Sequence, residues 1–174
     1  MYKKVLVSLL LVGILSVVSS CEDHESSVPS TVVNFSFSLQ QSPYSFITTP
    51  GQYLTVQKSG SGYVVKVPGQ PEYKDGKVGV YLGFGGLIIG YPAISMSTTS
   101  QYVAYDLACP TEASNLRVQR LSINANREAK CAKCGTTYDL DSGFPKEGAG
   151  KERLRTYAVY VTHTGTGTSL SIRN

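Results

Sequence analysis

The sequence predicts an all-β domain, and three observations support this fold class. Glycine, serine, threonine, valine and tyrosine are frequent, with 17 glycines and 12 tyrosines among 174 residues, a composition typical of strands joined by many turns. Several short segments alternate apolar and polar residues, as half-buried strands do. After residue 21, no segment has the periodicity of a long amphipathic helix. We therefore expect a small sandwich or barrel.

The expected strands follow one another along the chain. In the first, Val33, Phe35, Phe37 and Leu39 lie on one face and polar residues on the other. A Ser-Gly-Ser-Gly turn predicts that the second and third strands form a hairpin. We expect a loop over 68–76 and a helical turn within 124–129. The expected strands cover residues 32–39, 53–56, 63–67, 86–90, 102–107, 116–123, 155–162 and 169–172.

A glycine-rich run from Val78 to Gly90 precedes the middle of the chain. Such runs can bind phosphates when a helix and a Lys-Ser/Thr pair follow them. Neither follows here, so we interpret the run as a bend and a tightly packed strand through Leu87, Ile88 and Ile89.

The N-terminus predicts a processing signal. Lys3 and Lys4 precede an apolar run from Val5 to Val18, and Ser19-Ser20-Cys21 follows it. The run is shorter than the roughly 20 apolar residues that a membrane-spanning helix needs. Small residues before a cysteine resemble the lipobox of bacterial lipoproteins, in which the cysteine is lipidated after cleavage. The resemblance implies cleavage before Cys21 and anchoring on a bacterial membrane.

This signal sets the domain organisation. Residues 1–20 form the signal peptide, 21–31 a polar tether and 32–174 a single domain. The acidic residues after Cys21 resemble the export tag of surface-exposed lipoproteins. We therefore expect the protein to be located in the cell envelope, on the periplasmic or surface face of the outer membrane. Loss of Lys3 and Lys4 lowers the formal charge from +4 to +2. No basic run remains, which argues against a nucleic-acid partner.

Three cysteines remain if Cys21 carries lipid: Cys109, Cys131 and Cys134. Disulfides persist outside the cytoplasm. An odd number of cysteines in an exported protein indicates one bridge with a free thiol, a metal site, or a bridge to another chain.

The region 85–157 resembles the Rieske family. Tyr102-Val-Ala-Tyr-Asp-Leu-Ala-Cys109-Pro-Thr111 leads into the first loop, and Cys131-Ala-Lys-Cys134-Gly-Thr-Thr-Tyr138-Asp139 forms the second. A glycine turn and a closing Leu154-Arg-Thr-Tyr157 follow, in the family's order. The resemblance implies stacked antiparallel sheets or a small barrel, with two cysteine-bearing hairpin loops.

Rieske domains hold a two-iron cluster with two cysteines on one iron and two histidines on the other. By this resemblance Cys109 and Cys131 occupy the cysteine positions. Thr111 and Cys134 stand where the histidines belong. The chain has only His24, in the tether, and His163, near the end of a late strand. The resemblance therefore implies the fold with a degenerate ligand set.

Three states of the cysteines follow as alternatives. The first, which we adopt from the sequence, is a Cys109–Cys131 disulfide without a cofactor, with Cys134 left over or replacing Cys131 as the partner. The second is zinc on three thiolates, with Glu112, Asp139 or water as the fourth ligand. The third is a modified [2Fe-2S] cluster on the three cysteines and an oxygen ligand. A thioredoxin-like dithiol is disfavoured because that motif needs a following helix.

No catalytic motif accompanies these cysteines. Neither Gly-x-Ser-x-Gly nor His-Glu-x-x-His occurs. The paired Asp139 and Asp141 belong to a turn. We expect a non-enzymatic lipoprotein with a structural or binding role at the envelope, and electron transfer as the alternative.

Overall fold

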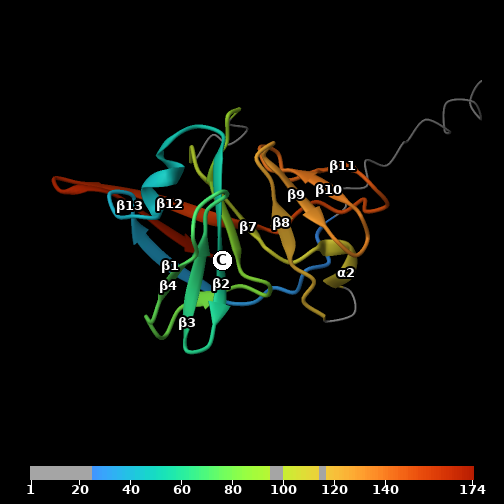
Figure 1. Ribbon diagram of the computed structural model, residues 1–174, viewed down its shortest axis with the longest axis horizontal. Coiled ribbons are helices and arrows are strands. Elements are labelled where there is room, and N and C mark those ends of the chain that lie inside the picture. The colour runs from blue at the N-terminus through green and yellow to red at the C-terminus, as the bar shows by residue number, and fades with distance from the viewer. Residues whose placement is uncertain (1–24, 95–99, 114–116) are drawn as a thin grey trace, which may run out of the picture.

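The computed structural model describes residues 25–94, 100–113 and 117–174. Over these residues the chain is nearly all β, as the composition and alternation predict. Two antiparallel sheets lie side by side (Figure 1), and within the described ranges neither closes into a barrel. Of the two architectures expected, open sheets are therefore the one observed.

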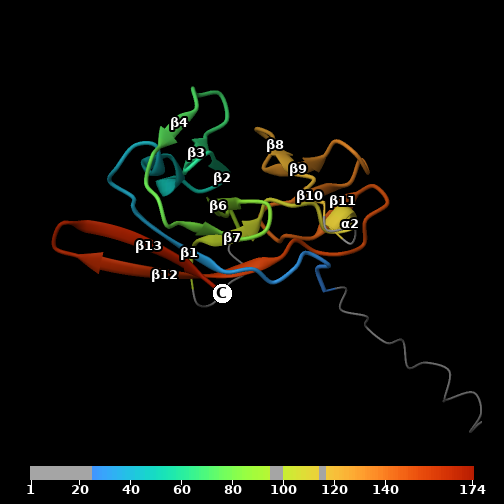
Figure 2. The same cartoon turned by 90° about the horizontal axis from the view of Figure 1, so that it is seen from below.

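The larger sheet contains most of the chain. Its strands are β1 (Val33–Ser38), β2 (Gln52–Ser59), β3 (Gly62–Lys66), β4 (Tyr73–Asp75), β5 (Tyr81–Leu82), β6 (Leu87–Tyr91), β7 (Val103–Asp106), β12 (Thr156–Thr164) and β13 (Gly167–Arg173). A 3₁₀ helix, η2 (Tyr44–Thr48), connects β1 to β2. The nine strands are ordered β4-β3-β2-β6-β7-β12-β13-β1-β5, and the β12–β13 hairpin extends beyond the rest of the sheet (Figure 2).

The smaller sheet carries the cysteine region. Its four strands are β8 (Leu121–Ile123), β9 (Glu128–Cys131), β10 (Thr137–Asp139) and β11 (Pro145–Glu147), in the order β11-β10-β9-β8. A single helical turn, α2 (Pro110–Ala113), lies between β7 and β8. An isolated bridge between Ala108 and Arg120 closes the base of this connection.

The central strands of the larger sheet are buried on both faces. Along β6, Leu87 and Ile89 face one hydrophobic core, whereas Ile88 faces a second core shared with the smaller sheet. All three side chains are 0% exposed. Because successive strand residues point to opposite faces, a strand between two cores needs an uninterrupted apolar run. This explains the Leu-Ile-Ile run, and the buried strand predicted there is confirmed.

Polar contacts tie the two sheets together beside this second core. Asp141 accepts hydrogen bonds from Tyr53 Oη at 2.6 Å and from the Ala93 backbone N–H at 3.1 Å. Its other oxygen forms a 2.7 Å ion pair with Arg127. Asp141 thus lies in a turn, as predicted, and also links that turn to β2.

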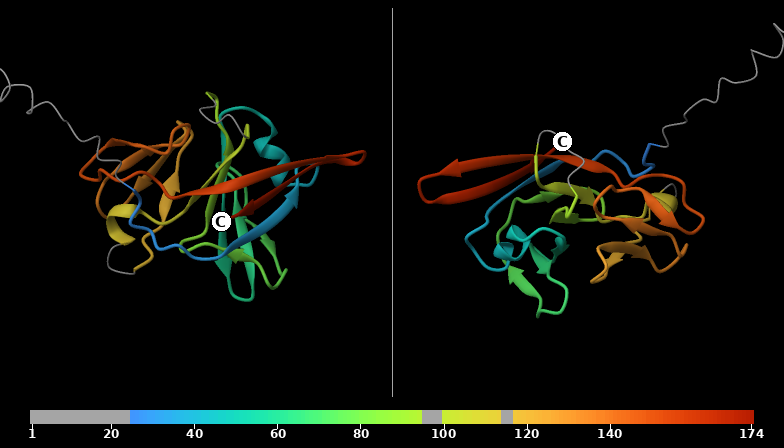
Figure 3. Two further views of the ribbon diagram at one scale, coloured as in Figure 1. Left: turned by 180° about the vertical axis from the view of Figure 1, so that it is seen from behind. Right: turned by 90° about the horizontal axis from the view of Figure 1, so that it is seen from above.

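The first described residues pack against the domain. Val28 is buried with Ala108, Ala113 and Phe84. Ser27 binds both carboxylate oxygens of Glu152, through its N–H at 2.7 Å and its hydroxyl at 2.8 Å. Figure 3 shows this blue segment passing close to α2. The predicted tether over 21–31 is therefore attached to the domain from residue 27 onward.

Three short segments differ from the sequence expectations. The helical turn predicted within 124–129 is instead the turn of the β8–β9 hairpin, in which Asn124 Oδ1 accepts the N–H groups of Asn126 and Glu128. Local side-chain bonds of this kind favour turns over helix. The expected loop over 68–76 contains β4, and the strand expected over 116–123 is limited to β8 within the described residues.

Candidate metal centre

The three cysteines lie on two loops at one end of the smaller sheet. Cys109 follows β7 and directly precedes α2. Cys131 ends β9, and Cys134 lies in the turn between β9 and β10. The second loop is a hairpin, as predicted, whereas the first is a longer connection that includes α2.

Backbone hydrogen bonds fix the hairpin that carries Cys131 and Cys134. The Cys131 N–H donates to Thr136 O at 2.9 Å, and the Gly135 N–H donates to Cys131 O at 3.1 Å. Gly135 has φ +74°, a conformation that a residue with Cβ rarely adopts. The Cys-x-x-Cys-Gly spacing therefore forms a tight reversal that brings both sulfurs to the same side.

The loop with Cys109 is fixed in a similar way. The Cys109 N–H donates to Gln119 O at 2.8 Å, across the base of the loop. The Cys109 carbonyl then accepts from Glu112 at 3.2 Å and Ala113 at 3.0 Å, which begins the helical turn. Pro110 suits the first helical position because its nitrogen has no hydrogen to leave unpaired.

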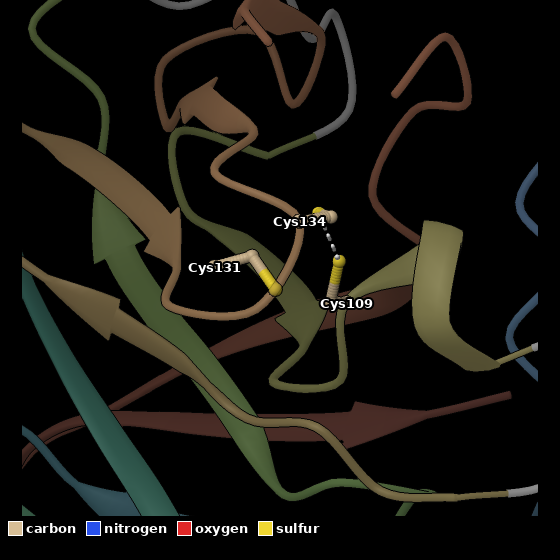
Figure 4. A group of neighbouring side chains, drawn as sticks. All are labelled: Cys109, Cys131 and Cys134. Atoms are coloured by element: carbon tan, nitrogen blue, oxygen red, sulfur yellow. Dashed lines mark hydrogen bonds between the residues drawn. The ribbon is translucent and has the colours of Figure 1, made fainter. Parts of the chain in front are cut away.

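The two loops bring all three sulfurs together (Figure 4). The Sγ atoms of Cys109 and Cys134 are 3.6 Å apart, and all three lie within 4.8 Å of one another. Cys109 and Cys131 are fully buried, and Cys134 is half-buried. The predicted meeting of these residues is confirmed. All three are free thiols in the structure, and the disulfide predicted from the sequence stays a prediction.

The thiols differ in acidity. Burial, together with hydrogen bonding to the neighbouring thiols, raises the pKa of Cys109 to about 12. Burial acts in the same direction on Cys134, but hydrogen bonds from the side chain and backbone N–H of Thr136 and from the Cys131 and Cys109 thiols together outweigh it, so the pKa of Cys134 is lowered. The half-buried Cys134 therefore ionises more readily than Cys109.

Hydroxyl groups and a glycine complete the surroundings of the sulfurs. Tyr138 Oη lies 3.8 Å from Cys109 Sγ and 3.4 Å from Thr111 Oγ1. Thr136 Oγ1 lies 3.2 Å from Cys134 Sγ and accepts the Gly150 N–H at 3.0 Å. A Cβ at Gly150 would approach Thr111 Oγ1 to 2.5 Å. A third loop therefore packs closely against both cysteine loops.

Glu112 and Asp139, the carboxylates expected as a fourth zinc ligand, do not join the three sulfurs. Glu112 forms an ion pair with Lys133, which joins the rims of the two cysteine loops. Asp139 accepts the Ser142 hydroxyl at 2.6 Å and the Ser142 N–H at 3.2 Å. Over the described residues, the grouping of potential metal ligands consists of the three cysteines without a carboxylate.

His163, the described histidine, does not reach the site either. His163 lies on the exposed β12–β13 hairpin, with Nδ1 3.0 Å from Thr168 Oγ1. His24 and Cys21 lie outside the described residues. A Rieske cluster needs two imidazoles on one iron. In the part of the chain that is described, the residues around the sulfurs do not fit this group, and Thr111 supplies a hydroxyl rather than an imidazole.

A buried carboxylate supports the Cys109 loop from below. Asp106 Oδ1 accepts the N–H groups of Gly85 at 2.9 Å and Ala108 at 2.8 Å. Its Oδ2 accepts the Phe84 N–H at 2.8 Å and the Tyr157 hydroxyl at 2.7 Å. Burial raises the pKa of Asp106, and the four donors oppose that effect. The residue before the first cysteine is thereby fixed.

Asp106, Tyr138 and Tyr157 lie within the sequence pattern that resembles the Rieske family, but the pattern predicts no role for them. The signal for Asp106 and Tyr157 was their position in the Rieske-like lead-in and closing strand. Thr136 and Gly150 also lie within segments of this pattern, but the sequence does not show that they meet, because their contact depends on the approach of a third loop.

Comparisons of the chain with protein-family models, with curated proteins and with solved structures gave no match. Among the described helices, none has the length and apolar character needed to cross a bilayer.

Proposed function

We propose that this chain is a bacterial envelope lipoprotein, anchored through lipid on Cys21, whose Rieske-like β domain has a non-enzymatic structural or binding role. The observation that carries the proposal is the site itself. Three sulfurs gather within 4.8 Å where a Rieske domain would have two sulfurs and two imidazoles. This ligand set supports a domain that has kept the two-loop architecture without the Rieske chemistry.

The start of the described chain supports a domain held close to a membrane. Ser27 is fixed to Glu152 and follows Cys21 by six residues. Six extended residues span at most about 20 Å. Since Val28 packs beside α2, the cysteine loops lie at the end of the domain where the chain enters. In this arrangement the cysteine end of the domain would lie near the membrane.

Metal and spectral analysis tests the role of the site. The full chain is purified in detergent without air, and iron, acid-labile sulfide and the visible spectrum are measured. We expect a colourless protein without stoichiometric iron and sulfide. A brown protein with two irons and two sulfides per chain would contradict the proposal.

Fatty-acid labelling tests the anchor. Cells that express the wild-type chain are expected to incorporate labelled palmitate into it, and cells that express Cys21→Ser are not. A Cys109→Ser variant is the matched control, because it also loses one thiol but should retain the label. Equal labelling of the Cys21→Ser variant and the wild type would contradict anchoring at Cys21.

Electron transfer is the second candidate, and the closeness of three sulfurs favours it. A cluster held by cysteine and an oxygen ligand would use the same three residues. The iron and sulfide measurement above separates the two candidates, because only electron transfer requires both elements in stoichiometric amounts.

A further inference from the structure

The relative positions of the three sulfurs indicate how many metal ions they suit. In a tetrahedral zinc site with bonds of about 2.3 Å, two sulfur ligands are about 3.8 Å apart. Cys109 and Cys134 are 3.6 Å apart, and no pair of the three exceeds 4.8 Å. In a two-iron cluster the four protein ligands are divided between two irons. Three sulfurs that are all mutual neighbours suit a single ion better than a cluster whose ligands are divided between two ions.

The chemistry of the ligands narrows the choice of ion. Thiolates bind zinc and other soft or borderline cations, whereas calcium and magnesium prefer oxygen. Binding of Zn²⁺ releases the three thiol protons, because the thiolate is the ligand. Three thiolates with one divalent ion leave a single negative charge, which a largely buried site accommodates better than three.

Hydroxyl groups lie beside the three sulfurs, and Cys134 is half-buried. No carboxylate or imidazole from the described residues joins the three sulfurs. Cys134 is half-buried, so water reaches this side of the group. The hydroxyls of Thr111, Thr136 and Tyr138 lie around it. Sites with three protein ligands and a water in the fourth position are a known zinc arrangement.

Contacts between side chains and backbone hold the two cysteine loops together. Lys133 and Glu112 form an ion pair across their rims, and the Gly150 N–H binds Thr136 Oγ1. Residues around metal ligands that fix their orientation commonly change metal affinity by about 10- to 100-fold. These contacts therefore help to fix the positions of the sulfurs.

We propose that Cys109, Cys131 and Cys134 bind a single zinc ion whose fourth position is open to water or a small external ligand. This inference deepens the binding role proposed above, at the same cysteines. It is independent of the lipid anchor, so its failure would leave the anchoring proposal intact.

The experiment measures zinc and cobalt binding by the full chain in detergent. Protein purified without air is analysed for zinc, then stripped with a chelator and titrated with Co²⁺. We expect one zinc per chain and thiolate-to-cobalt charge-transfer absorption that saturates at one Co²⁺. Zinc should displace the cobalt and abolish that absorption.

Two variants identify the ligands. Cys134→Ser should lower zinc affinity by more than about 100-fold, beyond the effect of losing a supporting residue. Its circular dichroism should stay unchanged, since Cys134 is half-buried. Lys130→Ala is the matched control on the adjacent strand β9, because its side chain is exposed, and it should bind zinc as the wild type does. If Cys134→Ser does not fold, the titration of the wild-type chain with Co²⁺ still decides the question.

Three results would overturn the proposal. The first is wild-type protein without zinc that gives no charge-transfer absorption with Co²⁺. The second is a disulfide between any two of the three cysteines in protein purified without air. The third is zinc binding that Cys134→Ser leaves unchanged.

Discussion

Tyr157 donates a 2.7 Å hydrogen bond to the carboxylate of Asp106, and both side chains are buried. The bond joins β12 to the end of β7, directly before the loop that carries Cys109. Because Asp106 also fixes the Ala108 N–H at 2.8 Å, the tyrosine supports the cysteine loop through the carboxylate.

Replacing Tyr157 with phenylalanine tests this support. The variant leaves a buried carboxylate with one donor fewer, and hydrogen bonds to charged groups contribute about 1.5–3 kcal/mol. We expect the free energy of unfolding, measured by urea denaturation, to fall by that amount. Tyr160→Phe is the control on the same strand, because Tyr160 is 56% exposed, and should change stability by less than about 0.5 kcal/mol. Equal losses in the two variants would show that the buried bond has no special role.

Gly150→Ala tests the packing of the third loop over the cysteines. A Cβ there would lie 2.5 Å from Thr111 Oγ1 and 2.9 Å from Thr136 Oγ1, so the loop or the threonines must move. We expect weaker Co²⁺ binding, by about 10-fold or more, because supporting contacts of a metal site have effects of that size. Gly165→Ala is the matched control, since a Cβ at that position meets nothing within 4 Å. Unchanged cobalt affinity in Gly150→Ala would show that this loop does not hold the site.

The elements that the sequence predicts well are those with a repeated pattern. The alternation from Val33 to Leu39 predicts β1, and the Leu87-Ile88-Ile89 run predicts β6, because both have enough residues to show which faces are buried. The strands β10 and β11 have three residues each and were not predicted. Three residues contain no period, so their pairing is decided by the neighbouring strands.

The candidate site, like the fold, could be predicted only in part from the sequence. The meeting of Cys109 with Cys131 and Cys134 could be predicted, because the spacing and flanking residues resemble a pattern with known geometry. Whether Glu112 or Asp139 supplies a fourth metal ligand could not be predicted from the sequence, because it depends on where each side chain points. Glu112 pairs with Lys133, and Asp139, at the end of β10, accepts a hydrogen bond from the turn that follows. Nothing in the sequence shows these pairings.

The pH dependence of stability tests the Tyr63–Asp75 hydrogen bond. Tyr63 Oη donates to Asp75 Oδ2 at 2.8 Å, and this bond, with the Lys77 N–H, holds the pKa of Asp75 below its ordinary value of about 3.9. A depressed folded-state pKa gives stability that is present above the ordinary pKa and is lost as the pH falls through the folded-state pKa.

We therefore expect the unfolding free energy of the wild type to exceed that of Asp75→Asn by a constant amount from pH 7 to pH 5. The difference should shrink below about pH 4. Urea denaturation at each pH measures it. In the Tyr63→Phe background the same comparison should give a smaller pH-dependent difference. If Tyr63→Phe leaves this pH-dependent difference in unfolding free energy unchanged, a donor other than Tyr63 lowers the pKa of Asp75.

The attachment of the chain before β1 can be tested at Val28. Its side chain is 1% exposed and packs with Ala108, Ala113 and Phe84, beside the cysteine loop. Val28→Ala removes two buried methyl groups, each worth about 0.8 kcal/mol, so stability should fall by about 1.5 kcal/mol or somewhat more if a cavity remains. Val32→Ala is the control, because Val32 is 60% exposed and should be nearly neutral. If residues 21–31 were a free tether, both variants would leave the urea midpoint unchanged. A loss confined to Val28→Ala would show that the chain before β1 is packed onto the domain beside the cysteine loop.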